Sequence, residues 1–219
     1  MTRPRSLPAA LVLAPLLGLG APRAAEVQVH VRDGKGKAVA DAVLVLVPAG
    51  RPPSAGEGSP RIVIDQVEKE FVPYVSAIRV GTLVTFPNRD NIRHHVYSFS
   101  PAKKFELPLY KGMPAQPVRF DQPGVVVLGC NIHDWMVAYV YVLESPHFAV
   151  TGPDGNAAVT ALPAGEYRVE AHHPRAKTEA APTTLLLGAG DSRRIEIEVG
   201  LRPDLRPPRA GKSGARAYP

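Results

Sequence analysis

The residues of this chain that could do chemistry gather in one short segment, Gly129-Cys130-Asn131-Ile132-His133-Asp134-Trp135-Met136, which reads C-x2-H-x2-M. Thiolate, imidazole and thioether groups are soft to borderline metal ligands, and a cysteine with two histidines and a weak axial methionine is the ligand set of blue copper. Apolar residues before and after the segment predict a strand on each side. Two such strands would hold the ends of the loop together, so that the loop can wrap three donors around one ion.

A second histidine ligand has to come from elsewhere in the chain. Two candidates, His94 and His95, end the segment Asn88-Arg89-Asp90-Asn91-Ile92-Arg93-His94-His95. His94 lies 36 residues before the cysteine. Neighbouring residues of a strand point to opposite faces, so only one of the two histidines can enter the site. The spacing by itself leaves the choice between them open.

Other interpretations of these residues have to be weighed. Cys130 is the only cysteine, and a lone cysteine is often a small buried apolar residue, just as a methionine often fills a gap in a core. The combination of cysteine, histidine and methionine in a strand–loop–strand segment favours a metal site over either. A binuclear copper centre would need two bridging cysteines. A multicopper oxidase would place histidines on both sides of the cysteine, where this chain has Gly129 and Asn131.

The elements that must position these donors are strands. Helical periodicity is nearly absent, and 24 prolines and 19 glycines separate short apolar, β-branched runs, which predicts an all-β sandwich or barrel. The expected strands are 27–31, 39–47, 62–67, 78–86, 95–99, 125–128, 137–142, 157–160, 167–172 and 195–199. A proline- and glycine-rich break at 48–60 and a change of character near 144–146 divide the chain. We expect a copper domain over 60–145, and a second small β-sandwich formed by the flanking segments 26–50 and 146–200.

The two ends of the chain have their own character. Arg3 and Arg5, an apolar run over 7–19 and small residues over 21–25 follow the order of a secretory signal peptide, expected over 1–25. An uncleaved anchor is the alternative. The net charge of +6 is concentrated at the ends, and 18 basic against 19 acidic residues remain between 26 and 201. This balance argues against nucleic-acid binding. The tail 201–219 is expected to be a disordered basic end.

Residues 62–143 resemble the plastocyanin and amicyanin family of cupredoxins. The resemblance is carried by Phe71-x-Pro73, by Val80-Gly81-x-x-Val84-x-Phe86-x-Asn88 and by the two histidine-bearing segments. It implies a Greek-key cupredoxin β-sandwich with one type 1 copper held by His94, Cys130, His133 and Met136. Family register favours His94 over His95, and His95 occupies a position that is commonly Asn in the family, from which we expect a hydrogen bond to the Cys130 loop.

Two weaker resemblances complete the picture. The whole arrangement is similar to exported proteins labelled as methylamine-utilization proteins. The flanking segment 151–167 resembles carboxypeptidase-regulatory-like sandwich modules, which implies a scaffold or docking role. The paired residues His172 and His173 have no soft ligand nearby in sequence, and we expect them to be structural or solvent-facing.

These observations together predict a periplasmic mononuclear blue-copper protein that carries one electron and is not an enzyme. The alternatives are a copper carrier or storage protein with the same ligands, and a structural β-sandwich module without redox function. The expected partner is a redox protein that docks near His133 and Trp135. We expect no stable insertion into a membrane after the signal peptide is removed.

Overall fold

The computed structural model describes residues 23–50, 60–114 and 116–206, and these residues form strands, turns and loops. The all-β prediction is therefore confirmed. Residues 1–22 of the expected signal peptide and most of the expected basic tail lie outside the described residues. Ala25, the last residue of the expected signal peptide, begins β1 and is buried in the core of the flanking strands. No helix in the described part of the chain is long and apolar enough to cross a membrane.

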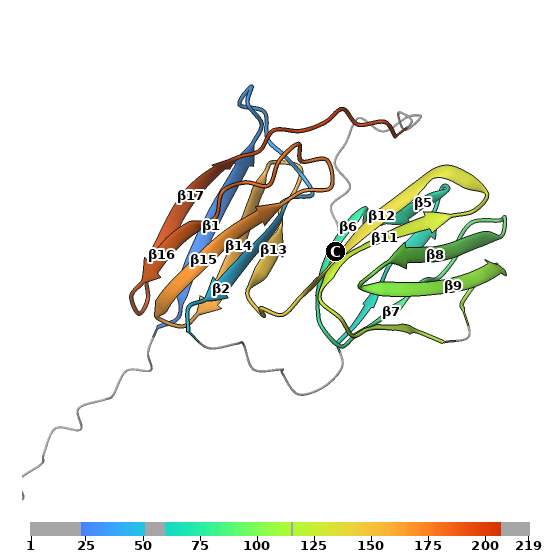
Figure 1. Cartoon of the computed structure of the whole chain (residues 1–219), viewed down its shortest axis with the longest axis horizontal. Helices are drawn as coiled ribbons and strands as arrows, with labels where there is room; N and C mark the ends of the chain where they lie inside the picture. The colour runs from blue at the N-terminus through green and yellow to red at the C-terminus, as the bar shows by residue number, and fades with distance from the viewer. Residues whose placement is uncertain (1–22, 51–59, 115, 207–219) are drawn as a thin grey trace, which may run out of the picture.

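One β-sandwich is built from the two flanking segments of the chain (left in Figure 1). Its first sheet has the order β14-β1-β17, with β14 at Asn156–Leu162, β1 at Ala25–Arg32 and β17 at Ser192–Glu198. Its second sheet has the order β13-β2-β15-β16, with β13 at Phe148–Val150, β2 at Val43–Pro48, β15 at Gly165–His172 and β16 at Thr183–Leu187. Alternate residues of β1 point inward, so Val27, Val29 and Val31 are buried between the sheets.

A second β-sandwich is built from the middle of the chain (right in Figure 1). Its larger sheet has the order β6-β12-β11-β8-β9, with β6 at Val75–Arg79, β12 at His133–Leu143, β11 at Gly124–Cys130, β8 at His94–Ser100 and β9 at Lys103–Tyr110. The smaller sheet has the order β10-β7-β3, with β10 at Val118–Phe120, β7 at Thr82–Thr85 and β3 at Arg61–Val63. A separate hairpin pairs β4 (Asp65–Val67) with β5 (Glu70–Val72).

Each sandwich has its own apolar core, and a smaller apolar cluster joins them. Phe86, Phe120 and Leu128 are fully buried in the core of the middle sandwich, which also contains the cysteine. The joining cluster packs Val43 and Val45 of β2 against residues of the middle sandwich that include Tyr141 of β12. The outer face of β12 is therefore covered by the neighbouring sandwich along part of its length.

Several expected strands differ from the structure for identifiable reasons. The run 39–47 begins as a strand only at Val43, because Asp41 adopts a φ of 63°, which an extended strand cannot accommodate. The run 78–86 is divided into β6 and β7 by a turn in which Gly81 has a φ of 91°. Strand β9 was not expected, because it contains Pro108 and because charged residues separate its apolar ones, so that it lacks a clear apolar run.

Candidate metal centre

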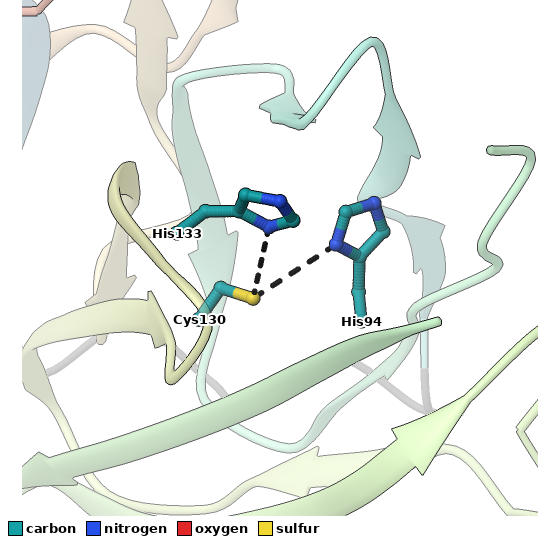
Figure 2. A group of neighbouring side chains, drawn as sticks. All are labelled: His94, Cys130 and His133. Carbon is teal, nitrogen blue, oxygen red and sulfur yellow. Dashed lines mark hydrogen bonds between the residues drawn. The ribbon is translucent and has the colours of Figure 1, made fainter. Parts of the chain in front are cut away.

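Three potential ligands from three strand ends meet at one end of the middle sandwich (Figure 2). His94 begins β8, Cys130 ends β11 and His133 begins β12. The Cys130 Sγ atom lies 3.9 Å from His94 Nδ1 and 3.7 Å from His133 Nδ1. The three ligand atoms lie within 4.8 Å of one another. His94 and Cys130 are buried and His133 is partly exposed, so the group lies just beneath the surface.

These distances fit a trigonal metal site. With bond lengths of about 2.3 Å to sulfur and 2.0–2.1 Å to nitrogen, as in protein zinc sites, donors at the trigonal angle lie about 3.8 Å apart. Donors at the tetrahedral angle would lie about 3.6 Å apart. The observed separations of 3.7 and 3.9 Å lie on either side of the trigonal value, and both exceed the tetrahedral value. A thiolate with two imidazoles in one plane is the strong part of a blue-copper ligand set.

Met136, the predicted axial ligand, lies on β12 three residues after His133. Its side chain is 1% exposed and belongs to the same apolar cluster as Cys130. Both residues also line one surface pocket together with Tyr97. Core packing alone would also account for this burial, so the ligand role of Met136 stays a prediction.

The two neighbouring histidines at the start of β8 have different surroundings. The His94 side chain is fully buried and its Nδ1 faces the cysteine. The His95 ring lies beside the β9 carboxylate, with Nε2 3.0 Å from Glu106 Oε1. The expectation that His95 hydrogen-bonds the Cys130 loop was wrong, because strand alternation turns the ring toward β9 instead.

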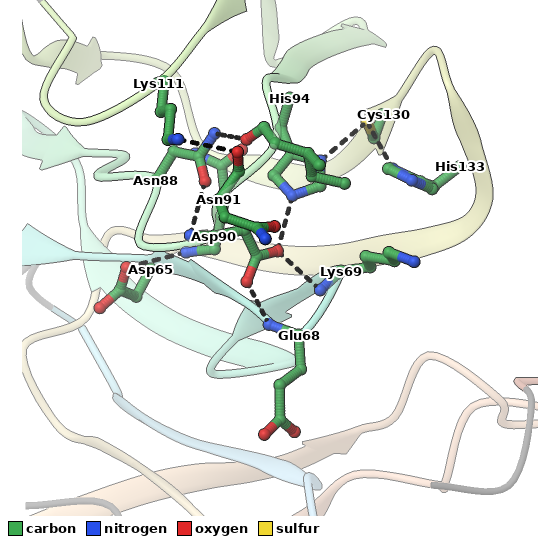
Figure 3. Close-up of polar contacts among 12 residues, drawn as sticks. Asp65, Glu68, Lys69, Asn88, Asp90, Asn91, His94, Lys111, Cys130 and His133 are labelled. Atoms are coloured by element: carbon green, nitrogen blue, oxygen red, sulfur yellow. Dashed lines mark hydrogen bonds and ion pairs between the residues drawn. The ribbon is translucent and has the colours of Figure 1, made fainter. Parts of the chain in front are cut away.

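Asp90 holds the outer nitrogen of His94 (Figure 3). The Asp90 Oδ2 atom lies 2.7 Å from His94 Nε2. The backbone N–H groups of Glu68 and Lys69, at the tip of the β4–β5 hairpin, donate to the two carboxylate oxygens at 2.6 and 2.8 Å. Burial by itself raises the pKa of Asp90, but the hydrogen bonds from His94, Lys69 and Glu68 outweigh it and leave the pKa below its ordinary value. The sequence pattern by itself assigned no role to Asp90.

Asn88 closes the loop that presents His94. Its Nδ2 donates to the carbonyl oxygens of Ile92 and Tyr110 at 2.9 and 2.8 Å. Its Oδ1 accepts from the backbone N–H of Asp90 at 3.0 Å. At 4% exposure Asn88 is buried, and these bonds satisfy its amide while fixing the path of the chain between β7 and β8. The loop therefore enters β8 in a defined conformation.

Gly129, next to the cysteine, lets the Tyr97 side chain of β8 pack closely against β11. Gly129 pairs with Tyr97 in the β8–β11 register. A Cβ atom at position 129 would lie 2.8 Å from the Tyr97 ring, closer than van der Waals contact allows. A larger residue would push the ring away or shift β11, and with it the adjacent Cys130.

The exposed edge of the site belongs to His133. Its ring centre lies 5.3 Å from that of Trp135, and the side chains of Ile132 and Trp135 are 48% and 44% exposed. Burial, with a smaller contribution from the positive charge of Lys69, lowers the pKa of His133. A lower pKa favours the neutral imidazole, which is the form that binds metal.

Comparisons with known proteins give partial structural likenesses. No protein-family model matches the chain, and no curated protein matches it. A copper-containing nitrite reductase from Thermus scotoductus SA-01 is 28% identical over 44% of this chain and 25% of its own, with a TM-score of 0.37. The reduced form of an amicyanin mutant is 25% identical over 46% of this chain and 98% of its own, with a TM-score of 0.35.

A purple cupredoxin from Nitrosopumilus maritimus is 26% identical over 39% of this chain and 100% of its own, with a TM-score of 0.33. The chain thus spans a quarter of the nitrite reductase and nearly all of the two small proteins. The solved neighbours include amicyanin, whose motifs the sequence resembles. At these TM-scores, we base the assignment of the site on the geometry of its own residues.

Proposed function

We propose that the protein is a mononuclear type 1 copper protein that carries one electron and has no catalytic activity of its own. The proposed ligands are Cys130, His94 and His133 in the trigonal plane, with Met136 as the axial contact. The observation that supports this most strongly is the group of one sulfur and two Nδ1 atoms, in which the Sγ–Nδ1 separations are 3.7 and 3.9 Å. Copper bound by these donors would supply a one-electron redox couple.

Rigidity of the ligand residues favours electron transfer over copper carriage. A carrier has to open its site to pass the metal on, whereas an electron carrier works best when its donors keep one geometry. His94 is fully buried and held by Asp90, and Asn88 fixes the loop before it. The donors are therefore already at ligand spacing by virtue of the protein's own contacts.

We further propose that the redox partner docks at the His133 edge. Ile132 and Trp135 are exposed around a partly exposed His133, and Asp134 adds a charge at the border. An apolar patch with a polar rim suits a small, short-lived interface. Location in the periplasm after cleavage of a signal peptide over 1–25 belongs to the same proposal.

The division of the chain is proposed on the same basis. Residues 60–145 would form the copper domain, and 26–50 with 146–200 a discontinuous domain beside it. Their separate apolar cores support this division. The flanking domain holds the copper domain through the cluster around Tyr141, which suggests a scaffold role.

Visible and electron-paramagnetic spectra of the copper-loaded protein test the proposal. We expect strong colour from thiolate-to-copper charge transfer, lost in Cys130→Ser and kept in the matched loop variant Asn131→Ser. Wild-type protein that takes up no copper, or a coloured Cys130→Ser, would refute the ligand assignment. Redox cycling without loss of copper to a chelator is the expected behaviour. Rapid loss of copper would favour the carrier function.

A further inference from the structure

Asp90 belongs to the loop before His94, and its carboxylate lies between the His94 ring and the turn of the β4–β5 hairpin (Figure 3). It accepts three hydrogen bonds: Oδ1 from the Glu68 N–H, and Oδ2 from the Lys69 N–H and from His94 Nε2. The Asp90 side chain is 13% exposed. A carboxylate that is largely shielded from water and accepts three hydrogen bonds is held in one orientation. One of its three partners, His94, is a proposed metal ligand.

The hairpin that supplies the two N–H groups adopts an unfavourable conformation to do so. Glu68 and Lys69 have φ values of 55° and 61°, in the left-handed region that Gly and Asn prefer. Each such residue costs about 1 kcal/mol or more. The turn directs both N–H groups at Asp90, and the charge-assisted bonds offset this cost. These bonds fix the carboxylate at the Nε2 side of the His94 ring, opposite the Nδ1 atom that faces Cys130.

The hydrogen bond to His94 decides which ring nitrogen carries the proton. An ionised carboxylate only accepts, so the proton of the contact lies on His94 Nε2. The lone pair then lies on Nδ1, the atom that faces Cys130 Sγ. A carboxylate on the outer nitrogen also makes the imidazole a stronger donor.

We propose that Asp90 is the positioning residue of His94: it sets the ring's tautomer and aim, and its negative charge favours the oxidised, more highly charged state of bound copper. The effect on copper rests on the proposed function, whereas the tautomer is a property of the metal-free protein. A partly buried charge this close to the site is screened less by water than a surface charge, so it affects the redox balance more.

The test compares Asp90→Ala with Asp65→Ala, a nearby carboxylate that pairs with Arg89 instead of His94. Both substitutions are made in a Lys69→Gly background, because Gly relieves the left-handed turn and keeps the hairpin stable without Asp90. Ring ¹⁵N shifts in the metal-free protein report the His94 tautomer. We expect Nε2–H in the background protein and in Asp65→Ala, and a mixture of tautomers in Asp90→Ala.

Copper binding provides the second measurement. Asp90→Ala should weaken copper binding by about 10- to 100-fold. It should also reduce the preference for oxidised over reduced copper by about tenfold, which is 59 mV upward in potential for one electron. Asp90→Asn keeps an oxygen that can accept from His94, so affinity should recover while the potential stays raised.

The outcomes separate the two proposals. An unchanged tautomer and potential in folded Asp90→Ala, equal to those of Asp65→Ala, would overturn the positioning role. A restored potential in Asp90→Asn would overturn the role of the charge. If the background protein binds no copper while the His94 tautomer still depends on Asp90, the proposed function fails and the positioning role stands.

Discussion

The adjacent residues His94 and His95 allow a matched pair of substitutions, His94→Ala and His95→Ala. Both residues begin the same strand, and both side chains are mostly buried, at 0% and 11% exposure. Only His94 faces the cysteine, whereas His95 contacts Glu106 on β9. The pair therefore separates loss of a ligand from loss of a buried ring on the same strand.

The metal-free stabilities should already differ. His94→Ala removes a charge-assisted hydrogen bond to Asp90, worth about 1.5–3 kcal/mol, in addition to packing. His95→Ala removes a contact with Glu106, whose side chain is 65% exposed, and such pairs contribute about 0–1 kcal/mol. Copper adds a larger difference. At free copper about 1,000-fold above its Kd, binding stabilises the wild type by about 4.1 kcal/mol.

This copper-dependent increment measures the ligand directly. A loss of about 1,000-fold in affinity would reduce the increment in His94→Ala to about 0.4 kcal/mol, whereas His95→Ala should keep nearly all of it. Urea unfolding with and without copper gives the increment for each variant, and Trp135, the single tryptophan, reports on the middle sandwich. A full increment in His94→Ala together with its loss in His95→Ala would show that the wrong histidine has been assigned.

Three further outcomes are expected. Met136→Leu should keep copper bound and raise the reduction potential, because the oxidised metal loses a weak donor; a colourless protein by visible spectroscopy would contradict this. Ile132→Asp or Trp135→Asp should leave the copper spectrum intact and slow electron exchange with the native partner about tenfold or more, as stopped-flow mixing would show; normal exchange would place docking elsewhere. Burial, with the charge of Arg175, lowers the pKa of His173 from 6.5 to about 4, so the unfolded chain binds more protons between these values. The contribution of neutral His173 to the free energy of unfolding is complete above pH 6.5. It falls by about 2 kcal/mol, after allowance for solvent screening, as the pH drops to 4. Urea titrations that give His173→Asn the same pH dependence as the wild type would refute this.

The candidate ligand loop could be proposed from the sequence because its possible donors are close together. Cys130, His133 and Met136 occupy one strand–loop–strand segment, and the identities of the residues are enough to suggest soft-metal chemistry. The structure brings Cys130 and His133 together with His94 as the resemblance implied. The all-β class followed from apolar runs separated by proline and glycine.

The contacts that hold the ligands in place were not predictable in the same way. The β4–β5 hairpin turns at Glu68 and Lys69, which carry no Gly, Asn or Pro turn signal. Their left-handed conformations are accompanied by hydrogen bonds to Asp90, which lies 22 and 21 residues later in the chain. These hydrogen bonds join segments that are distant in sequence, so local sequence signals do not reveal them. The one signal that could have suggested Asp90 is its position four residues before His94, close enough for a carboxylate to reach the ring.

The two histidines of the candidate site are held by different kinds of contact, and under the proposed function this difference suggests which of them faces the redox partner. His94 is enclosed, with its outer nitrogen on Asp90 and its loop fixed by Asn88. His133 lies at the surface beside the exposed ring of Trp135. Electron transfer to a partner needs a ligand near the contact surface, whereas a stable potential needs a ligand whose surroundings exclude water. One site can meet both requirements if one ligand is exposed and another is shielded. The partner should therefore approach His133, while Asp90 influences the potential through His94.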